Sequence, residues 1–277
     1  MEYLKLNNGI PMPVLGFGTF MLNGENCEKA VLSAIKEGYC MIDTAEAYGN
    51  EAEVGKAIVK SGIDRSELFI VTKVNYKSYE NVGITVEQSL KNLQTDYIDL
   101  LLLHWPFANY YNAWRELEKF YEKGKIRAIG VSNFEPGQLI DLIAYNRIVP
   151  AIDQIETNLY CQRVEERRWL NKKNVVHMAY APLGQGNRNE MFSEPVVTAL
   201  AEKYQKSAAQ ILLRFLTQKG ISVIPRSAKL EHIRENLCIF DFVLTEDEIS
   251  KLTALDQKHA MIGNPNNPEL VEMSLKW

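Results

Sequence analysis

The sequence predicts an α/β fold: a (β/α)8 barrel with an N-terminal β-hairpin cap and an extra C-terminal helix and loop. Eight short apolar runs, rich in leucine and β-branched residues, alternate along the chain with patterns of helical periodicity. No linker rich in Pro, Gly or Ser divides the 277 residues, and a barrel of this size commonly forms one domain. We therefore expect a single barrel domain over residues 1–277.

The first element is a hairpin, because Asn7-Asn8-Gly9 separates two short apolar segments and both residue types tolerate positive φ. Such a hairpin would cap one end of the barrel. The eight strands are then expected at Val14–Phe20, Tyr39–Thr44, Leu68–Val74, Ile98–His104, Ala128–Ser132, Ala151–Glu156, Val175–Ala179 and Ser222–Ile224.

The segments between these strands are mostly helical, and two of them show the helical spacing clearly. Each carries apolar residues on one face, so both helices should pack against the sheet. The residues are Val82, Val86, Leu90 and Leu93 in the segment Val82–Leu93, and Trp114, Leu117, Phe120 and Tyr121 in the next.

Two further features follow the eighth strand. A helix is expected over Glu231–Phe240, and Thr245 can cap another helix, with Glu248 completing a capping box. The tail from His259 to Trp277 is expected to be irregular.

Composition excludes several classes of protein. A net charge of −4 leaves no broad cationic surface for nucleic acid, and no stretch reaches the roughly 18 apolar residues of a membrane helix. The N-terminus lacks a signal-peptide pattern, so we expect a soluble, cytoplasmic protein. The cysteines form no C-x-x-C pair, which favours reduced thiols and no metal site; they are Cys27, Cys40, Cys161 and Cys238.

Four ionisable residues stand where predicted strands end: Asp43, Tyr48, Lys73 and His104. A Lys and a His at the ends of buried parallel strands are costly unless they are used. In a barrel, the carboxyl ends of the strands carry the active site. These four residues are therefore the predicted catalytic set.

Their chemistry suits the reduction of a carbonyl group, which needs a hydride at carbon and a proton at oxygen. Tyr48 is the expected proton donor, and Lys73 is expected to lower the pKa of its phenol. Asp43 would hold Lys73 charged through an ion pair. His104, expected to be neutral, would position the carbonyl oxygen.

Each residue also has a structural alternative when taken alone. Asp43 could cap a helix, Tyr48 could be a half-buried surface aromatic, Lys73 could be a salt-bridge partner, and His104 could be a hydrogen-bonded core residue. A doubly wound nucleotide-binding fold is the alternative architecture, but its G-x-G-x-x-G signature is missing. Met21 and Asn189 occupy the third glycine position in the two partial matches.

At this point the motifs resemble those of the aldo-keto reductase family, over about Met1 to Asp256, as in a bacterial-type member with a short loop. The matching segments, in order, are Leu15-Gly16-Phe17-Gly18-Thr19, Asp43-Thr44-Ala45, Ala47-Tyr48-Gly49-Asn50-Glu51, Leu103-His104-Trp105-Pro106, Gly130-Val131-Ser132-Asn133-Phe134 and Tyr180-Ala181-Pro182-Leu183-Gly184. The resemblance implies an NAD(P)H-dependent carbonyl reductase on a (β/α)8 barrel.

The resemblance also implies a cofactor site. Ser132, Asn133 and Gln154 match positions that hydrogen-bond the nicotinamide carboxamide, and Tyr180 matches the aromatic on which the ring stacks. As a structural alternative, the Ser-Asn pair could cap the next helix and the glutamine could satisfy buried backbone. Further cofactor contacts are implied for Gly18, Thr19 and Asp43, and along the pyrophosphate for Leu183, Gly184 and Gln185.

One further segment resembles the part of the family's cofactor site that binds adenosine. It consists of Arg226-Ser227 followed by Glu235-Asn236. Arg226 stands where the family commonly has Lys, and its guanidinium can still grip a 2′-phosphate. His232 stands where Arg is frequent, and a neutral imidazole gives up a charged contact. We therefore expect NADPH to be preferred over NADH, but less strongly than in relatives with both bases.

The substrate is expected to be a small or medium aldehyde or ketone, because Phe20 and Trp105 could line an apolar pocket beside Tyr48 and His104. Tyr110, Tyr111 and the C-terminal tail are further candidates, and the short loop 107–113 leaves one wall undefined. Three alternatives stay open: an NADP(H)-binding regulatory barrel, a reductase that uses both cofactors, and an isomerase of phosphate substrates. A monomer is common among similar proteins.

Overall fold

The computed structural model describes residues 1–186, 188–262 and 264–275. Its main feature is a sheet of eight parallel strands, ordered β10-β9-β8-β7-β6-β5-β4-β3. These strands are β3 (Phe17–Gly18), β4 (Met41–Asp43), β5 (Phe69–Val74), β6 (Ile98–Leu103), β7 (Ile126–Ser132), β8 (Ile152–Glu156), β9 (Val176–Tyr180) and β10 (Ser222–Val223).

The sheet closes on itself. Leu15 forms a parallel bridge with Val223, and the N–H of Gly16 donates to the carbonyl of Val223 at 2.9 Å. The predicted first strand, Val14–Phe20, is regular only at Phe17–Gly18, because its earlier residues make this closing contact. The (β/α)8 barrel predicted from the sequence is confirmed.

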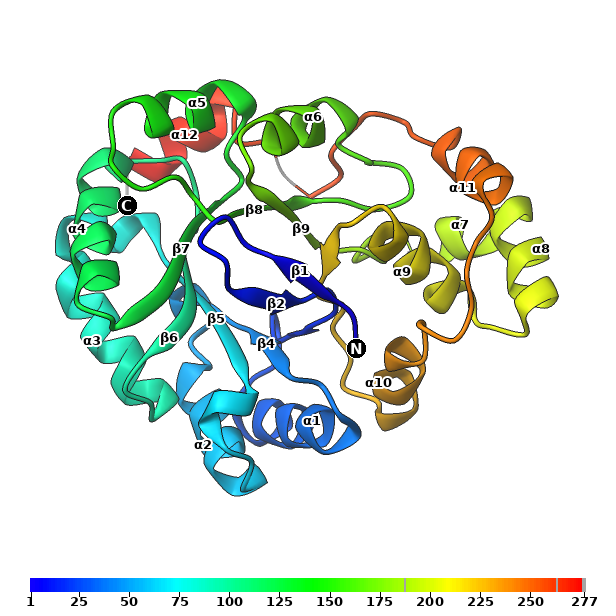
Figure 1. Cartoon of the computed structure of the whole chain (residues 1–277), viewed down its shortest axis with the longest axis horizontal. Coiled ribbons are helices and arrows are strands. Elements are labelled where there is room, and N and C mark those ends of the chain that lie inside the picture. The colour runs from blue at the N-terminus through cyan, green and yellow to red at the C-terminus, as the bar shows by residue number, and fades with distance from the viewer. Residues whose placement is uncertain (187, 263, 276–277) are drawn as a thin grey trace.

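Helices surround the barrel (Figure 1). Those between strands are α1 (Gly24–Glu37), α2 (Glu51–Ser61), α3 (Val82–Leu93), α4 (Tyr110–Glu122), α5 (Pro136–Ala144), α6 (Val164–Lys172), α7 (Arg188–Ser193), α8 (Pro195–Tyr204) and α9 (Ala208–Gln218). After the last strand come α10 (Leu230–Leu237), α11 (Glu246–Thr253) and α12 (Pro268–Leu275). The short 3₁₀ helices are Glu46–Tyr48, Arg65–Glu67 and Tyr76–Asn81.

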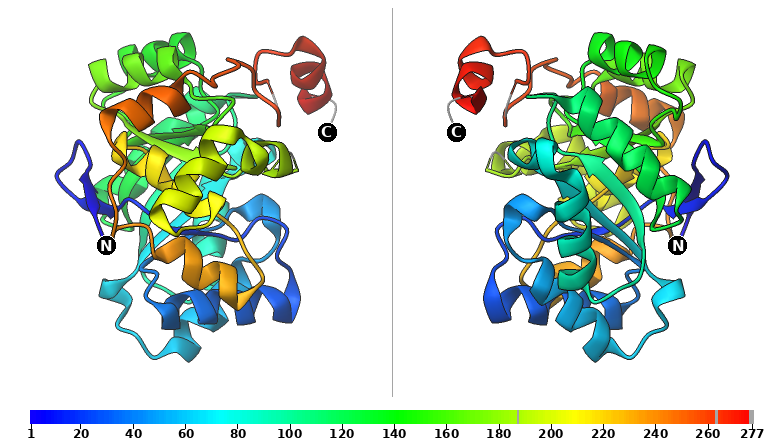
Figure 2. Two further views of the ribbon diagram at one scale, coloured as in Figure 1. Left: turned by 90° about the vertical axis from the view of Figure 1, so that its right-hand side faces the viewer. Right: turned by 90° about the vertical axis from the view of Figure 1, so that its left-hand side faces the viewer.

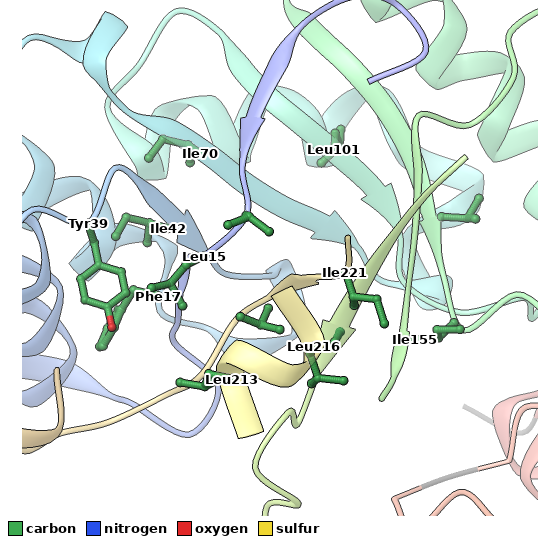
Figure 3. Packing of buried hydrophobic residues seen from close by; sticks show 14 of the residues in the cluster. Leu15, Phe17, Tyr39, Ile42, Ile70, Leu101, Ile155, Leu213, Leu216 and Ile221 are labelled. Atoms are coloured by element: carbon green, nitrogen blue, oxygen red, sulfur yellow. The ribbon is translucent and has the colours of Figure 1, made fainter. Parts of the chain in front are cut away.

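Both faces of the strands are buried, which explains their continuous apolar runs. Side chains that point outward, such as Ile42, Ile70 and Leu101, belong to one large cluster with the helices (Figure 3). Their neighbours Met41 and Val71 point inward, to a second cluster that fills the barrel. The alternation follows from the two-residue period of a strand.

The predicted hairpin is formed by β1 (Tyr3–Lys5) and β2 (Pro11–Pro13), paired antiparallel. Leu6 and Met12 are buried in the inner cluster, so the hairpin closes one end of the barrel. Figure 2 shows the hairpin at one end of the molecule and the C-terminal tail at the other. The tail therefore lies on the face where the strands reach their carboxyl ends.

Other sequence predictions for the helices are confirmed. The inward residues of α3 are buried, and so are Trp114 and Leu117 of α4. Thr245 and Glu248 form the capping box of α11. The helix expected over Glu231–Phe240 is α10, which ends at Leu237.

The prediction that the tail is irregular is wrong in part. The tail contains α12, whose first turn is capped by Asn267, because its Oδ1 accepts the N–H of Glu269 at 3.0 Å. The loop 107–113 is shorter than expected, because α4 already begins at Tyr110. No helix in the described ranges has the length and apolar character needed to cross a membrane.

Candidate active site

The four predicted catalytic residues converge at the carboxyl ends of three adjacent strands. Asp43 ends β4, Lys73 is the second-last residue of β5, and His104 directly follows β6. Tyr48 ends the 3₁₀ helix that follows β4. Because parallel neighbours end at one edge, residues 61 positions apart in the sequence meet in one site.

A buried ion pair forms the floor of the site. Lys73 Nζ lies 2.7 Å from Asp43 Oδ1 and 2.9 Å from the Thr44 carbonyl, and the side chains of Lys73 and Asp43 are 0% and 2% exposed. Burial lowers the pKa of Lys73, and the Asp43 carboxylate opposes that shift. The structural alternative of Asp43 as a helix cap is excluded, since its carboxylate is engaged here.

Tyr48 departs from the expected titration. Burial raises the pKa of Tyr48 well above its usual value, and the charge of Asp43 and the nearby Tyr180 add to the rise. We expected Lys73 to lower this pKa, but its ammonium donates to Asp43 and Thr44 and lies 5.2 Å from the centre of the Tyr48 ring. In this state Tyr48 keeps its proton at neutral pH.

His104 is neutral, as expected. Burial and the positive charge of Lys73 lower the pKa of His104 to about 3. Its ring meets the Tyr48 ring edge-on, with 5.8 Å between centres. Nδ1 is buried without a hydrogen-bond partner among the described residues. A proton on Nδ1 would therefore be a buried donor without an acceptor, which is unfavourable. The neutral tautomer with its proton on Nε2 is therefore favoured.

Two residues that the sequence pattern did not indicate as functional, Glu46 and Asn50, hold these loops in place. Glu46 accepts the N–H of Asn75 at 2.7 Å and the Ser78 hydroxyl at 2.5 Å, which ties the Tyr48 turn to the loop after Lys73. Asn50 accepts the Thr44 hydroxyl at 2.6 Å and donates to the Thr19 carbonyl at 3.0 Å. Asn50 lies inside a motif that the sequence already singled out, whereas Glu46 carried no such indication.

The residues expected at the nicotinamide form a connected set beside the four predicted catalytic residues, which are called the tetrad below. The Tyr180 hydroxyl donates to Asn133 Oδ1 at 2.8 Å, and Asn133 Nδ2 donates to the His104 carbonyl at 3.1 Å. Ser132 Oγ donates to the Gln154 carbonyl at 2.7 Å. The helix-cap alternative for Ser132 and Asn133 does not hold, because α5 is capped by Glu135.

Gln154 also contacts the catalytic set. Its Nε2 donates to Asp43 Oδ2 at 2.8 Å, so each oxygen of this carboxylate has a donor. Within the part of the chain that the structure describes, its Nε2 donates to Asp43 Oδ2 and to Met178 Sδ, not to buried backbone as in the structural alternative. Gly18 and Thr19 lie close by: the Thr19 hydroxyl donates to the Asp43 carbonyl at 2.9 Å, and a Cβ on Gly18 would lie 2.8 Å from the Ile224 carbonyl.

The residues expected along the pyrophosphate form a turn after β9. Gly184 has φ +75° and is buried against α7, where a Cβ would lie 2.5 Å from the Met191 methyl group. Leu183 is half-buried and Gln185 is exposed. The positive φ favours glycine at position 184, because other residues adopt it only with strain.

The adenosine set lies around the start of α10. Arg226, His232 and Glu235 are exposed, whereas Ser227 and Asn236 are buried. Among the described residues Arg226 has no carboxylate within 4 Å, so its charge is available to an anion. It borders a cavity of about 520 Å³ between α1 and α10, lined also by Asn23, Lys29 and Leu230.

Aromatic rings line the approach to Tyr48. The ring of Phe20, 44% exposed, lies 5.0 Å from that of Tyr48, and the Trp105 ring stacks on Phe107 at 5.3 Å. Tyr79, which no sequence pattern indicated, fixes the Trp105 backbone: its hydroxyl donates to the carbonyl at 2.7 Å and accepts the N–H at 3.2 Å.

The remaining aromatic candidates lie on α4. The rings of Tyr110 and Tyr111 stack on each other at 4.6 Å, Tyr110 packs edge-on against Phe134, and the Tyr111 hydroxyl donates to Asp141. These contacts turn both residues toward α5 and the core. In the described ranges no group of three or more His, Cys, Asp or Glu residues is arranged to hold a metal ion.

Comparison with known proteins identifies this arrangement. The family model described as the aldo/keto reductase family matches residues 14–257. The chain belongs to the aldo/keto reductase family. The resemblance deduced from the motifs is thus confirmed, and with it membership of a family of oxidoreductases.

Several relatives cover nearly the whole chain. Glyoxal reductase of Bacillus subtilis is 42% identical over 269 residues, covering 96% of each chain, and morphine 6-dehydrogenase of Pseudomonas putida is 39% identical, covering 91% and 90%. An aldo-keto reductase from a Medee basin deep-sea metagenome library has a TM-score of 0.93 at 38% identity, covering 95% and 98%. An aldo-keto reductase of Bombyx mori in complex with NADP has a TM-score of 0.88 at 32% identity, covering 95% of each chain.

Proposed function

We propose that this chain is an NADPH-dependent carbonyl reductase that converts aldehydes or ketones to alcohols. The observation that carries the proposal is the buried Lys73–Asp43 ion pair beneath Tyr48, with neutral His104 at the same edge. The pair places a positive charge near a phenol that holds its proton. This is the arrangement needed by a general acid.

Two residues of the tetrad, His104 and Tyr48, act on the carbonyl oxygen of the substrate. His104 donates a hydrogen bond from Nε2 to that oxygen, and Tyr48 transfers its hydroxyl proton to it. Bound NADPH would supply the hydride to the carbonyl carbon. Because the pKa of Tyr48 is raised, its hydroxyl stays protonated until it reacts. The Lys73 ammonium stabilises negative charge on the phenol oxygen as the proton leaves.

The residues around the tetrad fit a nicotinamide dinucleotide phosphate. Ser132, Asn133 and Gln154 offer amide and hydroxyl groups beside Asp43, and the Tyr180 ring would support the nicotinamide. The exposed cation Arg226 would hold the 2′-phosphate, with Ser227 beside it. Glu235 and Asn236 would contact adenine. His232 stands where the family often has Arg, so the preference over NADH would be moderate.

The substrate class is a small carbonyl compound. The walls near Tyr48 are aromatic, from Phe20, Trp105 and Phe107, and such rings suit the apolar part of a carbonyl compound. The 42% identical relative named glyoxal reductase supports dicarbonyls as a first group to test. We further propose a cytoplasmic monomer that binds neither membranes nor nucleic acid, which the net charge of −4 supports.

The test is NADPH consumption with a panel of dicarbonyls, aromatic aldehydes, aldoses and ketones, with NADH and Tyr48→Phe in parallel. Removing the acid should lower kcat by about 10²- to 10⁴-fold, since general acid catalysis contributes that much. The Kd of NADPH should stay unchanged, because the ring remains. Unimpaired turnover by Tyr48→Phe would remove this residue from the acid role. Tight NADPH binding without any turnover would instead favour a regulatory barrel.

A further inference from the structure

Glu156, the last residue of β8, holds the C-terminal tail through main-chain hydrogen bonds. Its Oε1 and Oε2 accept the N–H of Met261 at 3.0 and 3.1 Å, and Oε2 accepts the N–H of Ile262 at 2.9 Å. Asn158 Nδ2 donates to Oε1 at 3.2 Å. The residue is 0% exposed, and the proposed reaction does not use it.

The carboxylate of Glu156 depends on these donors. In the described part of the chain it forms no ion pair within 4 Å, since Arg163 pairs with Glu166 at 2.8 Å and donates from Nε only to the Glu156 main-chain carbonyl. A buried carboxylate is costly unless hydrogen bonds replace its water. The two backbone amides therefore stabilise the charge, and the charge fixes the position of residues 261 and 262.

The loop after β8 also binds the chain just before the tail that contains Met261 and Ile262. The N–H of Gln162 donates to Asp256 Oδ1 at 3.0 Å, and the N–H of Gln257 donates to the Tyr160 carbonyl at 2.8 Å. Glu156 makes the next contacts along the tail. Beyond them the chain continues to α12, on the face of the barrel opposite the hairpin (Figure 2).

Glu156 also lies beside the proposed nicotinamide platform. It pairs in register with Tyr180 on β9, whose hydroxyl holds Asn133. The tail is thus attached to the rim of the site itself. We propose that Glu156 is a positioning residue that fixes the tail, residues 259–262 and 264–275, at the mouth of the site and thereby sets which carbonyl substrates reach Tyr48. The part concerning substrates rests on the proposed function.

Hydrogen exchange tests the attachment without any assay of activity. Glu156→Gln keeps the shape but loses the charge and one acceptor, so the amides of Met261 and Ile262 should exchange about 10- to 100-fold faster, the factor expected for hydrogen bonds to a charged group. Glu51→Gln is the matched control. It removes another buried carboxylate, bonded to Thr72 at 2.6 Å, and should leave exchange in the tail unchanged.

A second variant leaves the buried carboxylate intact. Ile262→Pro removes one of the two donated N–H groups, whereas Ile262→Ala keeps it and removes only a side chain that is 37% exposed. Ile262→Pro should speed exchange at Met261, and Ile262→Ala should not. This pair keeps the attachment testable even where a change at Glu156 prevents folding.

Kinetics then test the consequence for substrates, with a small dicarbonyl and a bulky aromatic aldehyde. In Glu156→Gln and Ile262→Pro the ratio of kcat/KM values for the two substrates should shift in the same direction by at least about threefold, through KM rather than kcat. The double variant should shift it no further, since both changes release one segment. Glu51→Gln should keep the wild-type ratio, and Ile262→Ala serves only as the control for exchange at Met261.

The outcomes separate the two proposals. Unchanged exchange at Met261 in both Glu156→Gln and Ile262→Pro would overturn the attachment, and faster exchange with an unchanged substrate ratio would overturn its role in selectivity. If the wild-type chain reduces no carbonyl compound, the proposed function fails, while the exchange experiment still decides whether Glu156 holds the tail.

Discussion

Replacing Lys73 with Met should destabilise the protein and abolish reduction, and a second change should separate the two effects. Lys73 Nζ and Asp43 Oδ1 are 2.7 Å apart, and both side chains are buried. Removing one partner leaves an uncompensated buried charge, which costs about 3–5 kcal/mol of unfolding free energy. The hydrogen bond from Gln154 Nε2 to Asp43 remains at 2.8 Å, so we expect a value near 3 kcal/mol.

The double variant Lys73→Met/Asp43→Asn removes both charges. Its stability should return to within about 1–2 kcal/mol of wild type, because replacing a whole buried pair is often nearly neutral. Its activity should not return, since no ammonium stabilises the Tyr48 phenolate. The assays are urea unfolding followed by tryptophan fluorescence, and NADPH consumption. If the double variant is as unstable as Lys73→Met, or if Lys73→Met loses less than about 1 kcal/mol, the account of the pair is wrong.

Three further predictions concern other residues. Tyr180→Phe keeps the ring but loses the hydroxyl that donates to Asn133 at 2.8 Å. The Kd of NADPH, measured by fluorescence titration, should therefore rise about 2- to 10-fold. An unchanged Kd would contradict this role of the hydroxyl. His232→Arg adds a permanent charge beside the expected 2′-phosphate and should improve kcat/KM for NADPH over NADH about tenfold, whereas equal gains for both cofactors would place the phosphate elsewhere. Burial lowers the pKa of His177 to about 3, so the unfolded chain, with a pKa near 6.5, binds more protons between these values and stability rises with pH across that window. Between pH 5 and pH 7 this histidine should contribute about 2 kcal/mol, measured by urea unfolding, and His177→Asn should show a difference smaller by that amount.

Much of the site could be predicted because barrel topology converts strand ends into neighbours. Asp43, Lys73 and His104 each end an apolar run, and parallel strands bring such ends to one edge. The aldo/keto reductase motifs added the residues around them. Local patterns also fixed the hairpin and the capping box of α11, because both depend only on residues adjacent in sequence.

The remaining features depend on contacts between distant segments. The Asn-Pro cap of α12 was present in the sequence, but a short helix with little apolar spacing does not stand out from an irregular tail. The direction of the Tyr48 pKa could not be read from its neighbours in the chain. It depends on how deeply the phenol is buried and on Lys73 donating to Asp43.

The sequence by itself determined the eight-stranded barrel, the tetrad and the family, because periodicity, strand ends and ordered motifs are local properties. Only the tertiary structure decided that Gln154 supports Asp43 and that Glu156 holds the tail, across 111 and 105 positions of the chain. A glutamate reads the same in the sequence whether its carboxylate faces water or accepts hydrogen bonds from two backbone amides. Its partners are chosen by packing, which acts between segments that no local pattern connects.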